Sequence, residues 1–209
     1  MNIQEAYTHW STTYDVDRNL TRDLDQAVTA GALANLTCTS ILEIGCGTGK
    51  NTALLARLGQ KVVALDFSEG MIDRAREKLP SGNVLFAVAD ITTQWPCEDQ
   101  SVDLVVCNLV LEHVQDLSII FAESFRVLVD GGLLFVSELH PFRQYEGTKA
   151  HFQRDQQRTE IEAFVHHTSD FLSAAEDHGL SLKKMKEWWH TEDENQPPRI
   201  LSLMFEKPG

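Results

Sequence analysis

The sequence predicts an α/β protein with a doubly wound, Rossmann-like sheet of seven strands, mostly parallel with an antiparallel C-terminal strand, and helices on both faces. Three observations lead to this prediction. An apolar run ends in a glycine-rich loop at residues 41–50, apolar runs of strand length then alternate with stretches of helical periodicity, and several of these runs end in a polar or acidic residue. Alternation of this kind favours parallel strands joined by crossover helices.

Composition favours one domain, residues 1–209, and narrows the classes of partner. The net charge is −13 and no lysine or arginine cluster is present, so neither nucleic acid nor an anionic membrane is an expected partner. No signal peptide and no apolar stretch of about 18 residues is visible, so no membrane insertion is expected. The four cysteines form no C-x-x-C pair, which favours a reducing cytoplasm.

The first element, residues 1–35, is expected to be helical. Tyr7, Trp10 and Tyr14 recur at helical spacing, and apolar residues continue the pattern from Leu20 to Val28. Two interpretations remain open. The aromatic stripe packs on the core, or the segment folds over a ligand pocket as a lid.

The glycine loop is the second element and predicts a binding site for a small ligand. Gly45, Gly47 and Gly49 alternate directly after the strand, which lets the backbone approach a ligand closely. The spacing does not fit a P-loop, because Asn51 stands where a hydroxyl residue is needed. It does not fit a dinucleotide fingerprint either, because Lys50 stands where the third glycine is needed.

Later elements follow in alternation. A strand at 61–66 ends in Asp66, whose carboxylate suits the two ribose hydroxyls of a nucleoside. Ser68 is expected to cap the helix that carries Met71 and Ile72. The remaining expected elements are strands at 83–91, 101–109, 133–138, 182–189 and 200–206, and helices at 51–58, 117–128 and 169–178.

The spacing Glu43-x-Gly45-x-Gly47-x-Gly49 resembles the first motif of the class I S-adenosylmethionine-dependent methyltransferases. Asp66, the pair Asp90-Ile91, and an Asp-Leu-Val-Val segment ending near Asn108 follow in the order seen in that family. The resemblance covers residues 14–140. It is closest to the small-molecule branch, methyltransferase type 11, which acts on quinones, pimeloyl precursors and similar compounds.

This resemblance implies S-adenosylmethionine as the cofactor and assigns roles to individual residues. Arg22 is expected to pair with the methionine carboxylate, Asp90 to accept from the adenine amine, and the backbone of Ile91 to meet the ring. The expected cofactor-binding residues are Arg22, Gly45, Cys46, Gly47, Gly49, Asp66, Phe67, Met71, Asp90, Ile91, Asn108 and Leu109. The family also implies that residues 141–168 form an insertion that covers the substrate.

Two histidines at the expected binding edge are candidate catalytic bases, because an imidazole is neutral near pH 7. His113 follows the fourth strand and His140 follows the fifth. A structural role is the alternative for each. Glu112-His113 also resembles the E-x-x-E-H metal segment of ubiquinone O-methyltransferases, but Leu109 replaces the first acid, and the sequence predicts no metal.

The sequence therefore predicts transfer of a methyl group from S-adenosylmethionine to an oxygen, nitrogen or carbon of a small molecule, by a monomer or homodimer. In-line displacement on an activated sulfonium needs mainly alignment of the reactants. Two alternatives stay open: an NAD-binding oxidoreductase, and a non-catalytic module that binds the cofactor.

Overall fold

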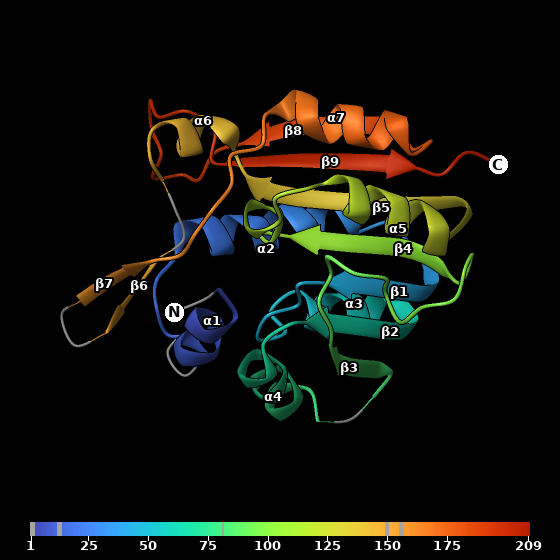
Figure 1. Ribbon diagram of the computed structural model, residues 1–209, viewed down its shortest axis with the longest axis horizontal. Coiled ribbons are helices and arrows are strands. Elements are labelled where there is room, and N and C mark those ends of the chain that lie inside the picture. Colours follow the sequence, from blue (N-terminus) through green and yellow to red (C-terminus); the bar gives the residue numbers. More distant parts are fainter. Residues whose placement is uncertain (1–2, 12–13, 81, 149–150, 155–156) are drawn as a thin grey trace.

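The computed structural model describes residues 3–11, 14–80, 82–148, 151–154 and 157–209. Its centre is a seven-stranded sheet in the order β3-β2-β1-β4-β5-β9-β8 (Figure 1). The strands are β1 Cys38–Ile44, β2 Gly59–Asp66, β3 Val84–Val88, β4 Val102–Asn108, β5 Leu128–Leu139, β8 Ser181–Trp188 and β9 Ile200–Glu206. Strand β9 runs in the direction opposite to the other six and is antiparallel to both of its neighbours, β5 and β8. The predicted fold class is confirmed.

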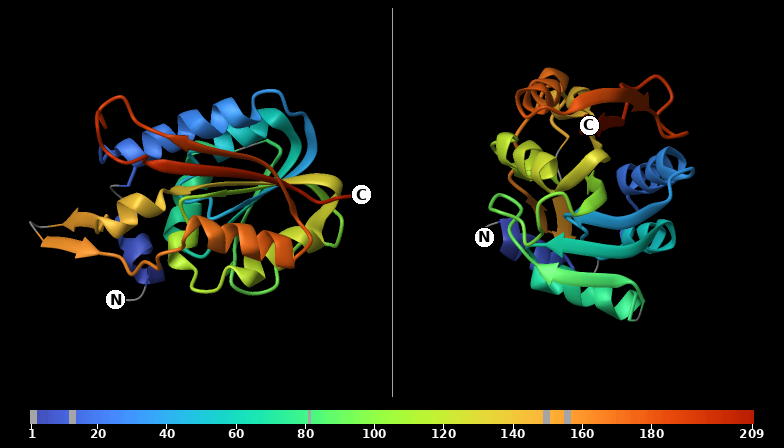
Figure 2. Two further views of the ribbon diagram at one scale, coloured as in Figure 1. Left: turned by 90° about the horizontal axis from the view of Figure 1, so that it is seen from above. Right: turned by 90° about the vertical axis from the view of Figure 1, so that its right-hand side faces the viewer.

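Helices cover both faces of this sheet, as Figure 2 shows. Helices α2 (Leu20–Leu33), α3 (Thr52–Leu58) and α4 (Glu69–Lys78) lie on one face, and α5 (Ser118–Val127) and α7 (Thr168–Asp177) lie on the other. The shorter elements are α1 (Ile3–Trp10), the 3-10 turn η1 (Leu111–His113), α6 (Pro141–Tyr145), and a two-stranded ribbon of β6 (His151–Arg154) and β7 (Gln157–Glu160).

Strand β4 explains why the sequence shows continuous apolar runs. Leu104 and Val106 pack with α2 and α3, whereas Val105 and Cys107 pack with α5 and α7. All four side chains are fully buried. Because successive side chains of a strand point to opposite faces, a strand covered on both sides needs an apolar residue at every position.

Three local features differ from the sequence prediction. The N-terminal helical segment is two helices, and α2 begins where the Asn19 side chain accepts hydrogen bonds from the backbone N–H groups of Thr21 and Arg22. Strand β5 starts at Leu128, before the expected 133, and turns at Gly131, whose φ is +77°. The ribbon β6–β7 lies within the insertion expected at 141–168, for which the sequence predicted no strand.

The arrangement leaves the carboxyl ends of β1, β2, β3 and β4 side by side at one edge. In Figure 1, α1 and the ribbon β6–β7 lie beyond this edge. In open α/β sheets, ligands bind at this edge. Within the described ranges, no helix is long and apolar enough to cross a bilayer.

Candidate active site

A cavity of about 270 Å³ opens at the carboxyl edge of the parallel strands. Its wall contains all the expected cofactor-binding residues except Gly49, and it also contains His113. The wall further includes Tyr7 and Tyr14 of the possible lid and Glu43 of the glycine motif. It also includes residues for which the sequence predicted no place in the site: Ile3, Asp25, Thr48, Lys50, Asn51, Ala89, Thr92, Val110 and Val114.

The glycine loop shapes the floor of this cavity. Gly45 has a φ of +70°, and a Cβ placed there would lie 2.7 Å from a methyl carbon of Val110. Gly47 has a φ of +54°, and a Cβ there would meet no atom within 4 Å. Gly49 instead packs against Ala75 of α4, because a Cβ atom added at Gly49 would lie only 3.2 Å from the Cβ of Ala75. The first two glycines therefore open the cavity, and the third serves helix packing.

Asp66 closes the side of the cavity nearest β2. Its two carboxylate oxygens accept hydrogen bonds of 2.9 Å from the backbone N–H groups of Gly47 and Ser68. Burial raises the pKa of Asp66 to about 6, and these two bonds oppose that rise. A carboxylate offers about four acceptor positions, so two remain for a ligand hydroxyl pair. The helix cap at this point is Ser68, as predicted, since its hydroxyl accepts from the Met71 N–H.

The side of the cavity next to β3 is mainly apolar. Phe67, Met71 and Ile91 line it, and Met71 is almost fully buried. Asp90 lies at this wall and stays exposed; its Oδ1 accepts hydrogen bonds from the backbone and hydroxyl of Thr92. An apolar slot beside a carboxylate suits a flat aromatic ring that carries an amine.

Asp25 is a buried acid that the sequence reading missed. It accepts hydrogen bonds from the side chains of Asn51 (2.9 Å), Asn108 (2.8 Å) and Ser137 (2.6 Å), and so joins α2 to the start of α3 and to β4 and β5. Burial raises its pKa despite these three bonds. One signal could have revealed it: Arg22, Asp25 and Thr29 form a polar stripe at i, i+3 and i+7 along α2, and all three are buried.

Two buried amide oxygens at the cavity wall lack a hydrogen-bond donor in the part of the chain that the structure describes. They are Asn51 Oδ1 and Asn108 Oδ1, and the amide nitrogen of each residue donates to Asp25. A buried acceptor without a donor is costly. The two oxygens are therefore available to a ligand that brings N–H donors, such as an ammonium group.

Arg22 places a cation at the same wall. Its guanidinium donates to the backbone carbonyls of Tyr14 and Asp17 and lies 4.0 Å from the centroid of the Tyr14 ring. Across the described residues it forms no ion pair with a carboxylate. A buried guanidinium without an anionic partner suits a ligand carboxylate. The wall thus offers matching places for both charged groups of an amino acid.

His113 lies where the cavity meets α1. Its Nδ1 is 2.8 Å from the carbonyl oxygen of Glu162, so Nδ1 carries the proton and donates. Its Nε2 lies 2.7 Å from the hydroxyl of Tyr7 and accepts from it. Burial lowers the pKa of His113, which keeps the ring neutral. The expected base therefore reaches the site, but Tyr7 occupies its free nitrogen.

His140, which was expected to face the acceptor, is not among the residues that line either cavity. Its Nδ1 accepts from the backbone N–H of Phe142 and so caps α6. Its Nε2 lies 3.0 Å from a carboxylate oxygen of Glu187 on β8. The ring is buried and burial lowers its pKa. Both nitrogens hold neighbouring elements together, so we assign His140 a structural role.

A second cavity of about 260 Å³ adjoins the first. The two share Tyr7, Tyr14, Arg22 and Leu109 as a common wall. The remaining walls are Trp10, Arg18, Asn19, Leu20, Thr21, Glu112, Leu139, Thr148 and Arg199. The sequence reading did not foresee this cavity, because its walls come from five separate stretches of the chain.

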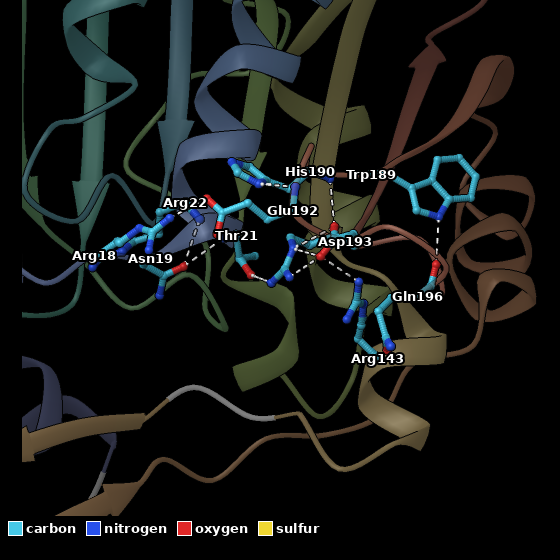
Figure 3. A network of polar contacts seen from close by, with 11 residues as sticks. Arg18, Asn19, Thr21, Arg22, Arg143, Trp189, His190, Glu192, Asp193 and Gln196 are labelled. Atoms are coloured by element: carbon cyan, nitrogen blue, oxygen red, sulfur yellow. Dashed lines mark hydrogen bonds and ion pairs between the residues drawn. The ribbon is translucent and has the colours of Figure 1, made fainter.

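The outer side of the second cavity is fixed by a polar network around Asp193 (Figure 3). The carboxylate of Asp193, 2% exposed, binds Arg199 and also lies 2.9 Å from Nη2 of Arg143 on α6. Arg199 also donates to the hydroxyl of Thr21 at the start of α2. Arg18 pairs with Glu192 in the same connection between β8 and β9.

The N-terminal segment is tied to the glycine loop and closes over it. Thr48 donates to Asp15 (2.7 Å), and Lys50 pairs with Asp23 (2.7 Å). Helix α1 also packs with residue 161: Ala6, Trp10 and Ile161 form one buried cluster. Parts of the expected insertion at 141–168 and of the expected lid at 1–35 lie outside the described residues.

The metal prediction concerns Glu112 and His113. The carboxylate of Glu112 lies 3.8 Å from Nε2 of His113. Among the described residues, no group of three histidine, cysteine, aspartate or glutamate side chains is arranged to hold a metal ion. The expected absence of a metal stays a prediction.

Comparison with known proteins gives a consistent picture. A family model described as "Methyltransferase domain" matches residues 42–136. A malonyl-[acyl-carrier protein] O-methyltransferase of Yersinia pestis is 32% identical over 81% of this chain and 59% of its own length. A trans-aconitate 2-methyltransferase of Variovorax paradoxus is 39% identical over 46% of this chain and 37% of its own length. The chain therefore spans about three fifths or less of the curated relatives it matches.

Solved structures share the fold. The N-methyltransferase NodS of Bradyrhizobium japonicum, solved in complex with S-adenosyl-L-homocysteine, superposes with a TM-score of 0.75 at 18% identity, and the match covers all of both chains. At this identity the likeness concerns the fold.

Proposed function

We propose that this chain is a class I S-adenosylmethionine-dependent methyltransferase, and that it transfers a methyl group from S-adenosylmethionine to a small-molecule acceptor. When bound, the cofactor supplies a methyl group on a sulfonium, which is already activated for displacement. The residues of the chain need only bind, align and exclude water.

The first cavity carries this proposal, because its polar groups match both ends of the cofactor. The orphaned amide oxygens of Asn51 and Asn108 suit the α-ammonium group, and Arg22 suits the α-carboxylate. Asp66 suits the ribose hydroxyls, and the slot of Phe67 and Ile91 suits adenine. In this proposal the nucleoside end lies near β2 and β3 and the amino-acid end lies near β1 and β4, because the matching side chains follow those strands.

The same groups argue against the two alternatives. A nicotinamide dinucleotide has no α-ammonium group, so it would leave the amide oxygens of Asn51 and Asn108 without donors. The dinucleotide-binding fingerprint also requires a third glycine at the position of Lys50. The side chain of Lys50 instead forms an ion pair with Asp23. A protein that only binds the cofactor needs no cavity for a second substrate. This chain has a second cavity that shares a wall with the first.

Isothermal titration calorimetry with S-adenosylhomocysteine and with NADH tests the proposal. We expect micromolar binding of the first and no heat from the second. Binding of NADH alone, or of neither compound, would remove the methyltransferase assignment. Transfer of label from S-adenosylmethionine to a panel of small acceptors then separates an enzyme from a binding module.

Several further assignments belong to the same proposal. The segment at 1–35 acts as a lid through Tyr7 and Tyr14, and residues 141–168 cover the acceptor. His113 orients Tyr7 instead of acting as the base, since Tyr7 already donates to its Nε2. The protein acts in the cytoplasm, in keeping with four free cysteines, as a monomer or homodimer, and does not bind nucleic acid.

A further inference from the structure

Glu112 occupies an unusual place in the wall of the second cavity. It lies in η1, directly after β4, and only 8% of it is exposed. The backbone around it is held firmly: Glu138 accepts from the N–H groups of Val110 and Leu111 at 3.0 Å, and the Glu112 carbonyl accepts from Phe164 at 2.7 Å. The backbone of this turn is therefore held by Glu138 of β5 on one side and by Phe164 on the other.

The carboxylate itself is only partly used. Glu112 Oε2 is buried and has no hydrogen-bond partner within the described ranges of the chain. Arg18, Arg22 and Arg199 line the same cavity, but Arg18 and Arg199 pair with other acids and Arg22 bonds to backbone carbonyls. A buried carboxylate oxygen without a donor is energetically costly unless a ligand supplies one.

We propose that the second cavity binds the methyl acceptor, and that Glu112 accepts a hydrogen bond, and then the proton, from the nucleophilic O–H or N–H group of that acceptor. This inference rests on the proposed function. The shared wall of Tyr7, Tyr14, Arg22 and Leu109 places the acceptor beside the cofactor cavity.

The reaction balances with no other reagent. The acceptor oxygen or nitrogen forms a bond to the methyl carbon, the bond from that carbon to sulfur breaks, and its electron pair stays on sulfur. The acceptor proton passes to Glu112 and then to water. Burial raises the pKa of Glu112 to about 7, although a hydrogen bond from the Gln144 amide acts to lower it. A general base is most effective when its pKa lies near the working pH.

The walls indicate the size and character of the acceptor. Trp10, Tyr14, Leu20 and Leu139 supply aromatic and apolar surface, and the cavity volume of about 260 Å³ suits a small ring or short chain. The acceptor class is therefore a small alcohol, phenol or amine whose apolar part contacts these four side chains.

The charges that surround Glu112 define how its ionisation should behave. They are His113 on its own turn, Tyr7 on α1, Glu138 on β5, and the cavity residues Arg18, Arg22 and Arg199. Because His113 is held neutral and Glu138 is itself buried, with its pKa raised to about 8, Glu112 is the group expected to titrate near pH 7.

The first test measures binding with phenol and anisole as probes, on protein saturated with S-adenosylhomocysteine. The two share a ring, but only phenol has a donor. By ligand-observed NMR, we expect phenol to bind about tenfold or more tightly than anisole, with the preference growing between pH 6 and pH 8. Glu112→Gln should remove the pH dependence, and Glu112→Met should remove the preference itself. The matched control, Glu146→Gln on the exposed end of α6, should behave like the wild type.

The second test measures turnover with labelled S-adenosylmethionine and a panel of phenols, alcohols and primary amines. We expect Glu112→Gln to lower kcat by about 100-fold or more, with a smaller change in KM and loss of the rise in rate through pH 7. Equal binding of phenol and anisole, no binding of either, unchanged kcat in Glu112→Gln, or no methylation of any O–H or N–H acceptor would overturn the inference. S-adenosylhomocysteine binding is measured first, because its absence overturns the proposed function instead.

Discussion

The hydroxyl of Tyr7 lies 2.7 Å from Nε2 of His113, a residue 106 positions later in the chain. This hydrogen bond joins α1 to the turn that follows β4, and the rings meet edge to face with centroids 5.3 Å apart. Since Tyr7 lines both cavities, the bond fixes the N-terminal helix over the point where the cofactor and acceptor would meet.

Tyr7→Phe should weaken the attachment of α1 over the two cavities, because it removes the hydrogen bond to His113 but keeps the aromatic ring. We expect a loss of about 1–2 kcal/mol in the free energy of unfolding, since His113 Nε2 loses its donor, together with lower methyl-transfer turnover. Urea denaturation and a labelled-cofactor assay measure the two effects. Tyr145→Phe is the control, because Tyr145 also bonds to a histidine, His167, but lies outside both cavities. Equal effects of the two variants would contradict the proposed cover.

Arg22→Gln should weaken binding of the amino-acid end of the cofactor and spare the nucleoside end. We expect affinity for S-adenosylhomocysteine to fall about 10- to 100-fold, because a charged hydrogen bond to its carboxylate is lost. Affinity for 5′-methylthioadenosine, which has no amino-acid end, should stay the same. Calorimetry on both ligands measures this contrast, and Arg18→Gln at the exposed rim is the control. Equal losses for the two ligands would point to a general disturbance of the fold.

Asp66→Ala should weaken the binding of both S-adenosylhomocysteine and 5′-methylthioadenosine, since both contain the ribose. We expect a loss of about 1–3 kcal/mol in binding free energy, the usual cost of hydrogen bonds to a charged group. Asp73→Ala, on the exposed side of α4, tests whether a change of charge alone has the same effect. Unchanged affinity in Asp66→Ala would exclude this residue from the ribose site.

The unliganded protein should lose stability as the pH rises from 6.5 to 8. Burial raises the pKa of Glu43 and of Glu138 to about 8, so the folded protein keeps protons that the unfolded chain has already released above its ordinary value of 4.5. The stability gained from these protons is complete below pH 4.5 and is lost as the pH rises toward 8. Each acid contributes up to about 1.4 kcal/mol per pH unit.

Histidines have the opposite effect only at lower pH. Burial lowers the pKa of His113 and His140, so their contribution to stability is lost as the pH falls below 6.5. Thermal unfolding between pH 6.5 and 8 therefore isolates the acids. Glu43→Gln should make the melting temperature less dependent on pH in this window, and an unchanged slope would show that Glu43 is ionised in the folded protein.

Sequence patterns were sufficient to predict the strands and the glycine loop, because the responsible forces are local. Strand β4 needs an apolar side chain at each position, and Gly45 and Gly47 adopt the positive φ values that glycine reaches without steric cost. The strand boundaries differ from prediction mainly at β5, where the turn at Gly131 depends on its neighbours in the sheet.

The polar groups of the site were less predictable. Asp25 and Glu112 were not assigned roles, and His140 was expected in the site but holds Phe142 and Glu187 instead. Asp25 carried only the weak signal of the polar stripe on α2, and the distant partners of Asp25 and His140, Asn108 and Glu187, are brought to them by folding.

The sequence by itself therefore determined the sheet, its binding edge and the kind of loop that holds a ligand, because burial on two faces and backbone freedom are properties of adjacent residues. Only the tertiary structure decided which polar side chains remain available to a ligand. Whether Asn51, Asn108, Arg22 and Glu112 are satisfied by the protein depends on partners that folding brings from elsewhere in the chain.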